Sequence, residues 1–147
     1  KVHGTGFVAR LSGSTAEFIH ILLHMTVGEK PFRVNGRGEL ELEFQPSLPA
    51  WLFTKEAGES SLWIGGRRQA VRFPARTFAF TFLGSIVVTY HNPRKRDTFG
   101  VDAVEPTRWR ITDLKGKSAI VEGNTVSGPL ARQIRDRKVS RIEIELG

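Results

Sequence analysis

The stretch TFAFTFLGSIVVTYH, residues 77–91, decides the fold class of this chain. Phenylalanines occupy every second position in its first part, at Phe78, Phe80 and Phe82. A period of two is typical of a β-strand that has one face on a core. Gly84 separates this strand from a second run over residues 85–91, and a glycine between two such runs indicates a tight hairpin. We therefore predict two antiparallel strands joined at Gly84.

The same patterning recurs on both sides of this hairpin. Leucine and phenylalanine alternate with glutamate over residues 39–44, and turn residues such as Gly65-Gly66 and Asn92-Pro93 separate later apolar segments. Further strands are expected at residues 61–64, 69–73, 107–112, 118–121 and 141–146. About eight short strands at hairpin spacing predict a mainly β fold, an antiparallel two-sheet sandwich of the jelly-roll kind. One short helix is expected at residues 129–137.

A longer helix is predicted ahead of the strands, over residues 14–27. Ser14 and Glu17 stand at the spacing of a capping box, in which each side chain satisfies a free amide of the first turn. Gly28 then offers a left-handed stop. Apolar residues recur at spacings of three and four and form one face that must be buried: Phe18, Ile21, Leu22 and Met25. The expected architecture is thus one N-terminal helix followed by a β-sandwich.

Composition excludes several classes of protein. The 147 residues suit one domain, and 39% hydrophobic with 25% charged residues excludes a disordered or collagen-like chain. The absence of cysteine excludes disulfide scaffolds, thiol catalysis and Cys-ligated zinc, and favours a reducing, cytoplasmic compartment. The longest apolar run, residues 21–23, is far too short for a membrane span, so no membrane partner is expected. Because the first residue is Lys1 and not Met, we expect a piece of a longer protein.

Two short patterns resemble ligand-binding motifs but lack part of the context that those motifs need. Residues 4–9, GTGFVA, fit the dinucleotide pattern G-x-G-x-x-[GA], but no strand precedes them and no helix opens within them. His20 and His24 lie one helical turn apart, a spacing that suits a metal, but the central glutamate of H-E-x-x-H is missing. Hydrogen-bonded imidazoles beside the apolar face are the preferred interpretation. No resident cofactor is expected, and no catalytic residue is assigned, because nothing brings Asp97, Asp102 and Glu105 together.

Residues 11–17, LSGSTAE, are more informative. Small residues let the backbone approach a ligand closely, hydroxyl groups offer donors, and a helix beginning there directs free amides to the same place. The segment is therefore able to hold an anion such as phosphate. It is equally a plain capped helix, and its residues alone leave both interpretations open.

The net charge of +7, from 22 Lys+Arg against 15 Asp+Glu, is unevenly distributed. Residues 1–59 contain 6 basic and 7 acidic side chains, whereas residues 60–147 contain 16 and 8. RNA or another acidic polymer is one possible partner. However, Arg108 and Arg110 should lie on one strand face and Trp109 on the other, which separates charge from stacking. A solvated basic surface is therefore preferred, and a nucleic-acid partner is not expected.

Three segments in order carry a resemblance: residues 6–14 (GFVARLSGS), Lys30-Pro31-Phe32, and residues 40–53 (LELEFQPSLPAWLF). Together they resemble the C-terminal end of the cellobiose phosphorylase and cyclic glucan synthase group of glycoside phosphorylases. In that group a large (α/α)₆ barrel ends in a Ser/Thr-Gly-Ser/Thr turn and a helix, and the chain enters a β-sandwich through an L-x-L-x-P-x-[IL]-P-x-W type stretch. The resemblance implies that residues 1–30 are the terminal helix of a truncated barrel and that residues 31–147 are the C-terminal β-sandwich.

The resemblance also implies a chemistry, which is inverting phosphorolysis of a glucosidic bond with inorganic phosphate as co-substrate. In the family the hydroxyl-bearing turn helps to hold the phosphate, a role that would fall to Ser14 and the amide of Thr15. The general acid and the sugar subsites belong to barrel segments that this sequence lacks, so the chain alone should not turn over. The apolar face of the helix at residues 14–27 is then expected to self-associate or to pair with the missing barrel.

The alternative function is that of a free-standing carbohydrate-binding module. It would use aromatic side chains as stacking platforms, namely Trp51, Trp63, Trp109 and Tyr90. Exposed, coplanar rings on one sheet face would favour this function, and buried rings would remove it.

Overall fold

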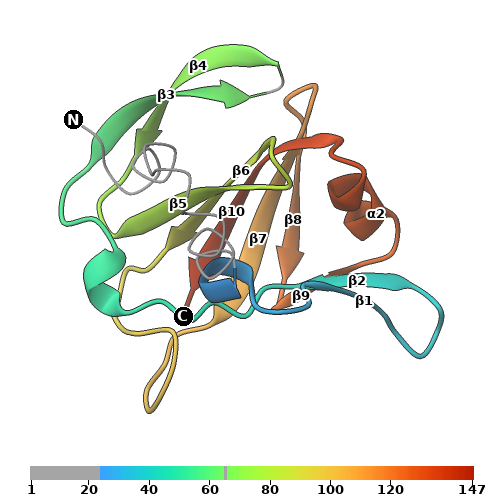
Figure 1. Ribbon diagram of the computed structural model, residues 1–147, viewed down its shortest axis with the longest axis horizontal. Coiled ribbons are helices and arrows are strands. Elements are labelled where there is room, and N and C mark those ends of the chain that lie inside the picture. The colour runs from blue at the N-terminus through green and yellow to red at the C-terminus, as the bar shows by residue number, and fades with distance from the viewer. Residues whose placement is uncertain (1–23, 65) are drawn as a thin grey trace, which may run out of the picture.

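The computed structural model describes residues 24–64 and 66–147. The described chain is mainly β, and its sheets are almost wholly antiparallel, which confirms the predicted fold class (Figure 1). A five-stranded sheet has the order β5-β6-β10-β7-β8, a three-stranded sheet has the order β1-β2-β9, and β3 and β4 form a ribbon. Residues 24–27 are helical, whereas the rest of the helix predicted at residues 14–27 lies outside the described residues.

The strands of the five-stranded sheet are β5 (Thr77–Phe82), β6 (Ile86–His91), β7 (Pro106–Asp113), β8 (Ser118–Glu122) and β10 (Val139–Leu146). The small sheet contains β1 (Phe32–Val34), β2 (Leu40–Glu43) and β9 (Thr125–Ser127). The ribbon consists of β3 (Gly58–Ile64) and β4 (Arg67–Phe73), and two short helices complete the fold, η3 (Ala50–Leu52) and α2 (Pro129–Arg135).

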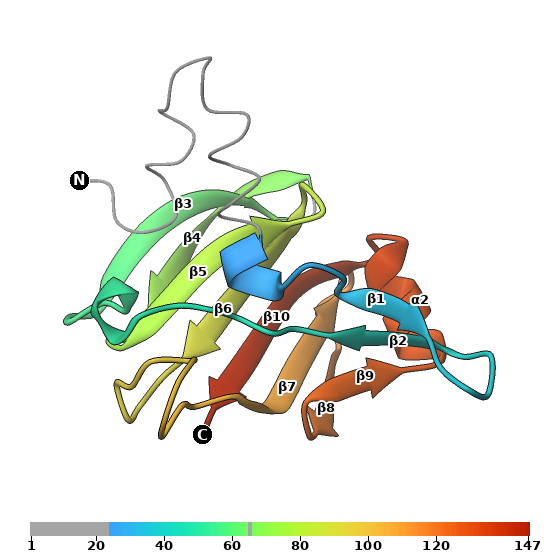
Figure 2. The same cartoon turned by 60° about the horizontal axis from the view of Figure 1, so that its bottom comes forward.

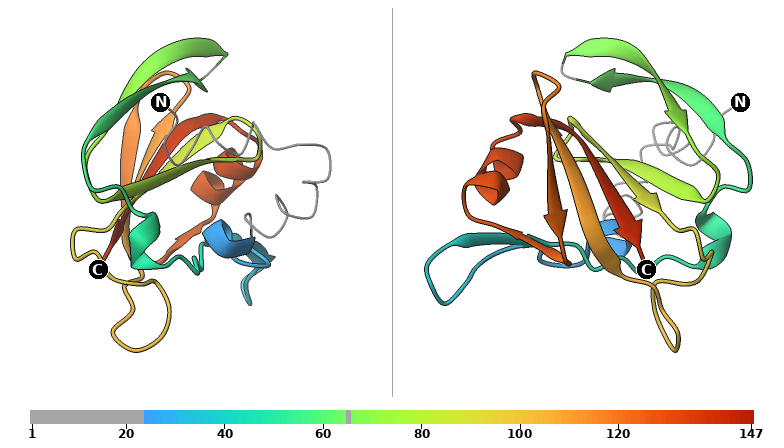
Figure 3. Two further views of the ribbon diagram at one scale, coloured as in Figure 1. Left: turned by 60° about the vertical axis from the view of Figure 1, so that its left-hand side comes forward. Right: turned by 180° about the vertical axis from the view of Figure 1, so that it is seen from behind.

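The five-stranded sheet is the central layer. Its inner face packs against the small sheet and α2 through one large apolar core, in which Phe44 contacts the Trp109 ring at a centroid distance of 5.1 Å. Figure 2 shows β2 crossing in front of this sheet, with α2 beside it. A second, smaller core lies on the opposite face, where Val71 and Phe73 of the ribbon meet Ala79 and Val87. The ribbon therefore covers only the β5 and β6 part of the outer face, and it is seen from two further sides in Figure 3.

The predicted hairpin over residues 77–91 is present. Phe82 pairs with Ile86, and the turn between them holds Leu83 and Gly84 at φ 54° and 78°. Two successive residues with positive φ are required by the type I′ turn, whose twist matches a hairpin. The helix predicted at residues 129–137 is also confirmed, as α2.

Three features were not anticipated from the sequence. The strands β1 and β9 have only three residues each, too few for an alternation to be recognised. The last strand, β10, lies between β6 and β7, and it pairs with β6 in parallel, so the expectation of antiparallel pairing is wrong at this one ladder. Apolar alternation identifies which face of a strand is buried, but it contains no information about strand direction.

Candidate functional site

Several predicted site residues lie outside the described residues. These are the phosphate-site residues Ser14 and Thr15, the glycine pattern of residues 4–9, and Glu17 and His20. Most of the apolar helix face expected to be unpartnered also falls there, although Met25 and Val27 lie within the described part and pack on the large core. Among the described residues no group of three His, Asp or Glu side chains could hold a metal ion.

Trp109, one of the predicted sugar-stacking residues, must be corrected. Its side chain is 0% exposed on the inner face of β7, so it cannot stack on a ligand in this structure. The alternation predicted for this strand is confirmed, because Arg108 and Arg110 are exposed on the opposite face. Tyr90 is corrected for the same reason. It is fully buried, its hydroxyl donates to the carbonyl oxygen of Thr26, and burial raises its pKa well above the usual value.

Trp51 and Trp63 are exposed, by 77% and 64% respectively. They belong to different elements. Trp63 lies on β3 opposite Arg68 of β4, on the ribbon face turned away from the central sheet, since its neighbour Ile64 packs inward. Trp51 lies in η3 and not on a strand. The two rings therefore do not share one sheet face, and each is a separate exposed aromatic side chain.

The turn that presents Trp51 is firmly anchored. Leu48 and Phe53, on either side of it, are each 1% exposed in the large core. The amide of Ala50 donates to Asp97 Oδ1 at 2.8 Å, and the amide of Leu48 donates to Thr98 Oγ1 at 2.7 Å. We therefore assign the Asp97 carboxylate a structural role, because it holds this turn in place. Next to this loop, Phe99 and Val101 are also exposed, by 47% and 93%.

The helical residues 24–27 are joined by backbone hydrogen bonds to residues 45–47, which precede the turn that carries Trp51. The amide of Gln45 donates to the Val27 carbonyl oxygen at 3.0 Å, and the amide of Ser47 donates to that of Met25 at 2.7 Å. Gly28, at φ +92°, ends the helical turn in the left-handed conformation predicted for it. A Cβ at Gly28 would come within 3.2 Å of Gln45 Cβ, so a larger residue would disturb both segments.

A polar hollow of about 290 Å³ lies on the part of the central sheet that the ribbon leaves open. We call it the outer hollow, and its lining residues come from β6, β7, β8 and β10: His91, Arg108, Arg110, Ile120, Glu143 and Glu145. The register explains why they meet. His91, Glu145 and Arg108 are successive cross-strand partners, and Glu143, Arg110 and Ile120 form the adjacent row.

Charges in the outer hollow are partly paired. His91 Nε2 lies 3.1 Å from Glu143 Oε1, and Arg108 Nε lies 3.2 Å from Glu122 Oε2 at the rim. The hydrogen bond with His91 holds the pKa of Glu143 below its usual value, and the charges of Arg141 and Arg110 act in the same direction against partial burial. Among the described residues, neither the Glu145 carboxylate nor the Arg110 guanidinium has a hydrogen-bond partner.

The remaining arginines of the basic half of the chain come from different elements. Arg67, Arg68 and Arg72 lie on the ribbon strand β4, whereas Arg76 lies in the turn before β5 and donates to the carbonyl oxygen of Pro93 at 2.6 Å. The run at residues 94–96 belongs to a loop of its own.

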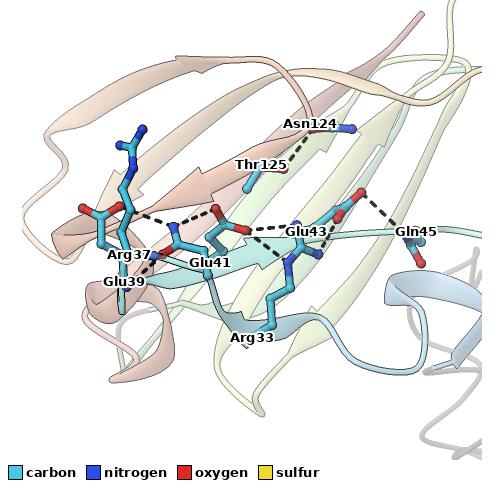
Figure 4. Close-up of polar contacts among 9 residues, drawn as sticks. Arg33, Arg37, Glu39, Glu41, Glu43, Gln45, Asn124 and Thr125 are labelled. Atoms are coloured by element: carbon cyan, nitrogen blue, oxygen red, sulfur yellow. Dashed lines mark hydrogen bonds and ion pairs between the residues drawn. The ribbon is translucent and has the colours of Figure 1, made fainter.

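The small sheet carries an acidic row that consists of Glu39, Glu41 and Glu43, and neighbouring Arg33 and Asn35 side chains bind these carboxylates (Figure 4). Arg33 Nη1 donates to Glu43 Oε1 at 2.6 Å, and Arg33 Nε donates to Glu41 Oε1 at 3.1 Å. Asn35 Nδ2 adds a hydrogen bond to Glu41 Oε2 at 2.9 Å. The hydrogen bond with Glu43 raises the pKa of Arg33. These contacts join β1 to β2, so we assign the row a structural role.

An apolar hollow of about 400 Å³ lies between residues 52–60 and the ends of β4 and β5. Leu52, Phe73 and Phe78 contribute its apolar lining, and Lys55, Glu56 and Glu59 contribute its charges. None of the three tryptophans lines it.

Sequence reasoning missed His91, Glu143 and Glu145 as site residues. One signal was present, because Arg108 and Arg110 repeat at period two, as do Glu143 and Glu145 with opposite charge. Such pairs indicate two polar strand faces that could attract each other. Only the topology shows that these two strands are neighbours.

No protein-family model and no curated protein matches this chain. No helix among the described residues has the length and apolar character needed to span a bilayer.

Proposed function

We propose that this chain is the C-terminal part of a carbohydrate-active enzyme similar to glycoside phosphorylases, and that its sandwich supports a catalytic body without being catalytic itself. The observation that carries this proposal is the pair of backbone hydrogen bonds that join residues 24–28 to residues 45–47. Ser47 donates to Met25 and Gln45 donates to Val27, so the helix end and the proline-rich stretch form one unit. Residues 45–47 belong to the stretch at residues 40–53 on which the resemblance rests, and residues 24–28 are the end of the helix that precedes it. Their hydrogen bonds support a continuous transition from a helix into a β-sandwich.

The exposure of Trp51 is a second support. Its neighbours Leu48 and Phe53 are buried, yet its own ring is 77% exposed on a turn held by Asp97. A large aromatic side chain presented on a well-ordered turn is typical of a contact surface. With Phe99 and Val101 exposed on the adjoining loop, this end of the sandwich is suited to lie against another domain.

The chemistry of the intact enzyme follows from the resemblance. A phosphate oxygen attacks the anomeric carbon as the glycosidic C–O bond breaks, and a carboxylic acid of the catalytic body protonates the departing oxygen. Ser14 and the amide of Thr15 would hold the phosphate, since the helix predicted to begin there would supply free N–H groups. The cysteine-free composition is consistent with a cytoplasmic enzyme.

The decisive experiment compares two lengths of this protein. The native polypeptide is identified by its mass, and both it and the 147-residue chain are assayed for phosphate-dependent cleavage of β- and α-glucosides. We expect a product several times longer that is active and a short chain that is not. Ser14→Ala in the longer form should raise the phosphate KM with little effect on kcat. A native protein of 147 residues, or unchanged phosphate kinetics in the variant, would refute the proposal.

A second candidate is a free-standing carbohydrate-binding module that would use Trp51 and Trp63 as two separate contacts, because both rings are exposed although they do not share one sheet face. Affinity electrophoresis of the 147-residue chain in gels containing soluble glucans tests it. Retardation that is lost in Trp51→Ala or Trp63→Ala, and kept in Trp109→Phe, would support this function. Equal mobility with and without glucan would exclude it.

A further inference from the structure

We infer that the outer hollow binds a single neutral sugar ring through its hydroxyl groups. The choice of a sugar rests on the proposed carbohydrate-related function, whereas the site itself is defined by its own geometry. The hollow lies on the central sheet, and neither Trp51 nor Trp63 is among the residues that line it.

The size of the hollow limits the ligand. Pockets for drug-sized molecules begin at roughly 300 Å³. At about 290 Å³ the outer hollow is suited to one ring and not to an oligosaccharide. The four strands that line it lie side by side in the sheet (Figure 1), so its polar groups are held on a hydrogen-bonded framework rather than on loops.

The charges of the hollow argue against an ionic ligand. Arg108 and Arg110 are matched by Glu143 and Glu145, and Arg108 is additionally paired with Glu122. An anion such as phosphate would meet two carboxylates, and a cation would meet two guanidinium groups. Carboxylate and guanidinium groups together suit a ligand whose hydroxyls both donate and accept hydrogen bonds.

Glu145 and Arg110 are the groups available to such a ligand. Neither has a hydrogen-bond partner among the described residues, and they occupy diagonal positions on the neighbouring strands β10 and β7. Diagonal residue positions on neighbouring strands stand about 7–8 Å apart, which is within the reach of long side chains, so both groups can contact one pyranose ring. Glu145 would accept from one hydroxyl and Arg110 would donate to another.

The remaining lining residues complete the site. Ile120 is 43% exposed beside Arg110 and offers an apolar surface to the C–H face of the ring. The Glu143 carboxylate is held by His91, which keeps it in place as a further acceptor. The hollow thus combines one apolar contact with several directed polar groups. Most small-molecule sites are mainly apolar, so this polar lining suits a ligand that carries many hydroxyl groups.

The test is a titration of the ¹⁵N-labelled 147-residue chain followed by NMR. Glucose and methyl β-glucoside are the sugar probes, and glycine and inorganic phosphate are the ionic probes. We expect saturable shifts of β7 and β10 amides with a sugar and none with the ionic probes. Arg110→Gln and Glu145→Gln should each weaken sugar binding about tenfold, the usual effect of losing a charged hydrogen bond.

Matched controls are Arg94→Gln and Glu105→Gln, which change the same residue types at exposed positions outside the hollow. Both should bind sugar as the wild type does, and thermal unfolding verifies that all four variants are folded. The inference is refuted if sugars cause no saturable shift, if the hollow variants bind like the controls, or if glycine or phosphate binds there instead. Sugar binding without phosphorolysis by the longer protein would refute only the proposed function, and phosphorolysis without sugar binding here would refute only this inference.

Discussion

At the scale of single residues, the tryptophans illustrate how position decides the role of a side chain. Trp109 is 0% exposed within a cluster that includes Phe44, whereas Trp51 and Trp63 project from the surface. Trp109 also has a buried Nε1 atom without a hydrogen-bond partner in the described structure. An unpaired buried donor is unfavourable, so the large apolar contact of the ring must outweigh it.

The first prediction concerns this ring. Trp109→Ala should lower the free energy of unfolding by about 3–5 kcal/mol, because it removes a large buried side chain and leaves a cavity. Trp109→Phe should cost less than half as much, since it keeps part of the ring volume and removes the unpaired N–H. Urea unfolding monitored by circular dichroism measures both. Trp63→Ala is the control, expected within about 0.5 kcal/mol of wild type; an equal loss in Trp63→Ala and Trp109→Ala would contradict the assignment.

The second prediction concerns the pair of His91 and Glu143. The pKa of Glu143 is lowered, first by the hydrogen bond from His91, so its stabilising contribution is complete above the usual value near 4.5 and is lost as pH falls through the folded value. Glu143→Gln should therefore be less stable than wild type at neutral pH, by at most about 1 kcal/mol for this partly exposed pair. The deficit should shrink below pH 4.5.

Urea unfolding at a series of pH values between neutrality and acid measures this difference. Glu105→Gln is a matched control at an exposed position, and its difference from wild type should remain nearly constant. A deficit in Glu143→Gln that grows on acidification would contradict the direction of the pKa shift.

At the scale of elements, the central sheet is completed by the last strand of the chain, β10. β5 and β6 form a local hairpin, whereas β10 pairs with β6 on one side and with β7 on the other. The same strand supplies Ile142 and Ile144 to the core, both 0% exposed. The sheet is therefore completed only when the last segment of the chain is in place.

The third prediction concerns the hairpin turn between β5 and β6. Leu83 has φ 54°, a conformation that asparagine and glycine adopt more readily, so Leu83→Asn should stabilise the protein by about 0.5–1 kcal/mol. Gly84→Ala should destabilise it by about 1–2 kcal/mol, because φ 78° is unfavourable for a residue with a Cβ atom. Thermal unfolding compares the two variants with Ser85→Ala as a neutral control. Opposite signs are expected, and a loss of stability in both would contradict this account of the turn.

At the scale of the whole molecule, the described residues form one layered body with two unlike surfaces. One surface is apolar and contains the exposed side chains of Trp51, Phe99 and Val101, and the other is the outer hollow on the open half of the central sheet. A surface that is apolar at one end and polar on one sheet face suits a domain that both contacts a neighbour and binds a small ligand.

The fourth prediction uses this difference. In the 147-residue chain Trp51→Ala should change the free energy of unfolding by no more than about 0.5 kcal/mol, because the ring is 77% exposed. In the longer protein the same substitution should lower the unfolding temperature, since we expect the ring to be covered there. Differential scanning calorimetry of both lengths measures this. Trp63→Ala serves as the control, and an equal, small effect of Trp51→Ala in both lengths would contradict the proposed contact.

Elements that depend only on neighbours along the chain could be predicted from the sequence. The alternation in residues 77–82, the turn at Gly84 and the helix Pro129–Arg135 all arise from local periodicity and backbone preference, and they are present as predicted. The opposite orientation of Trp109 and its flanking arginines followed from the same period of two. Local sterics and the burial of apolar side chains are sufficient for such features.

The pairing of strands that are distant in the chain, in contrast, could be learned only from the folded structure. The parallel pairing of β10 with β6, the covering of half a sheet by the ribbon, and the meeting of His91, Arg110 and Glu145 all join segments far apart in the chain. Such pairings depend on the combined fit of every layer and on the entropy of closing long loops, and no local pattern contains that information. The strand faces could therefore be predicted, whereas the outer hollow built from them could not.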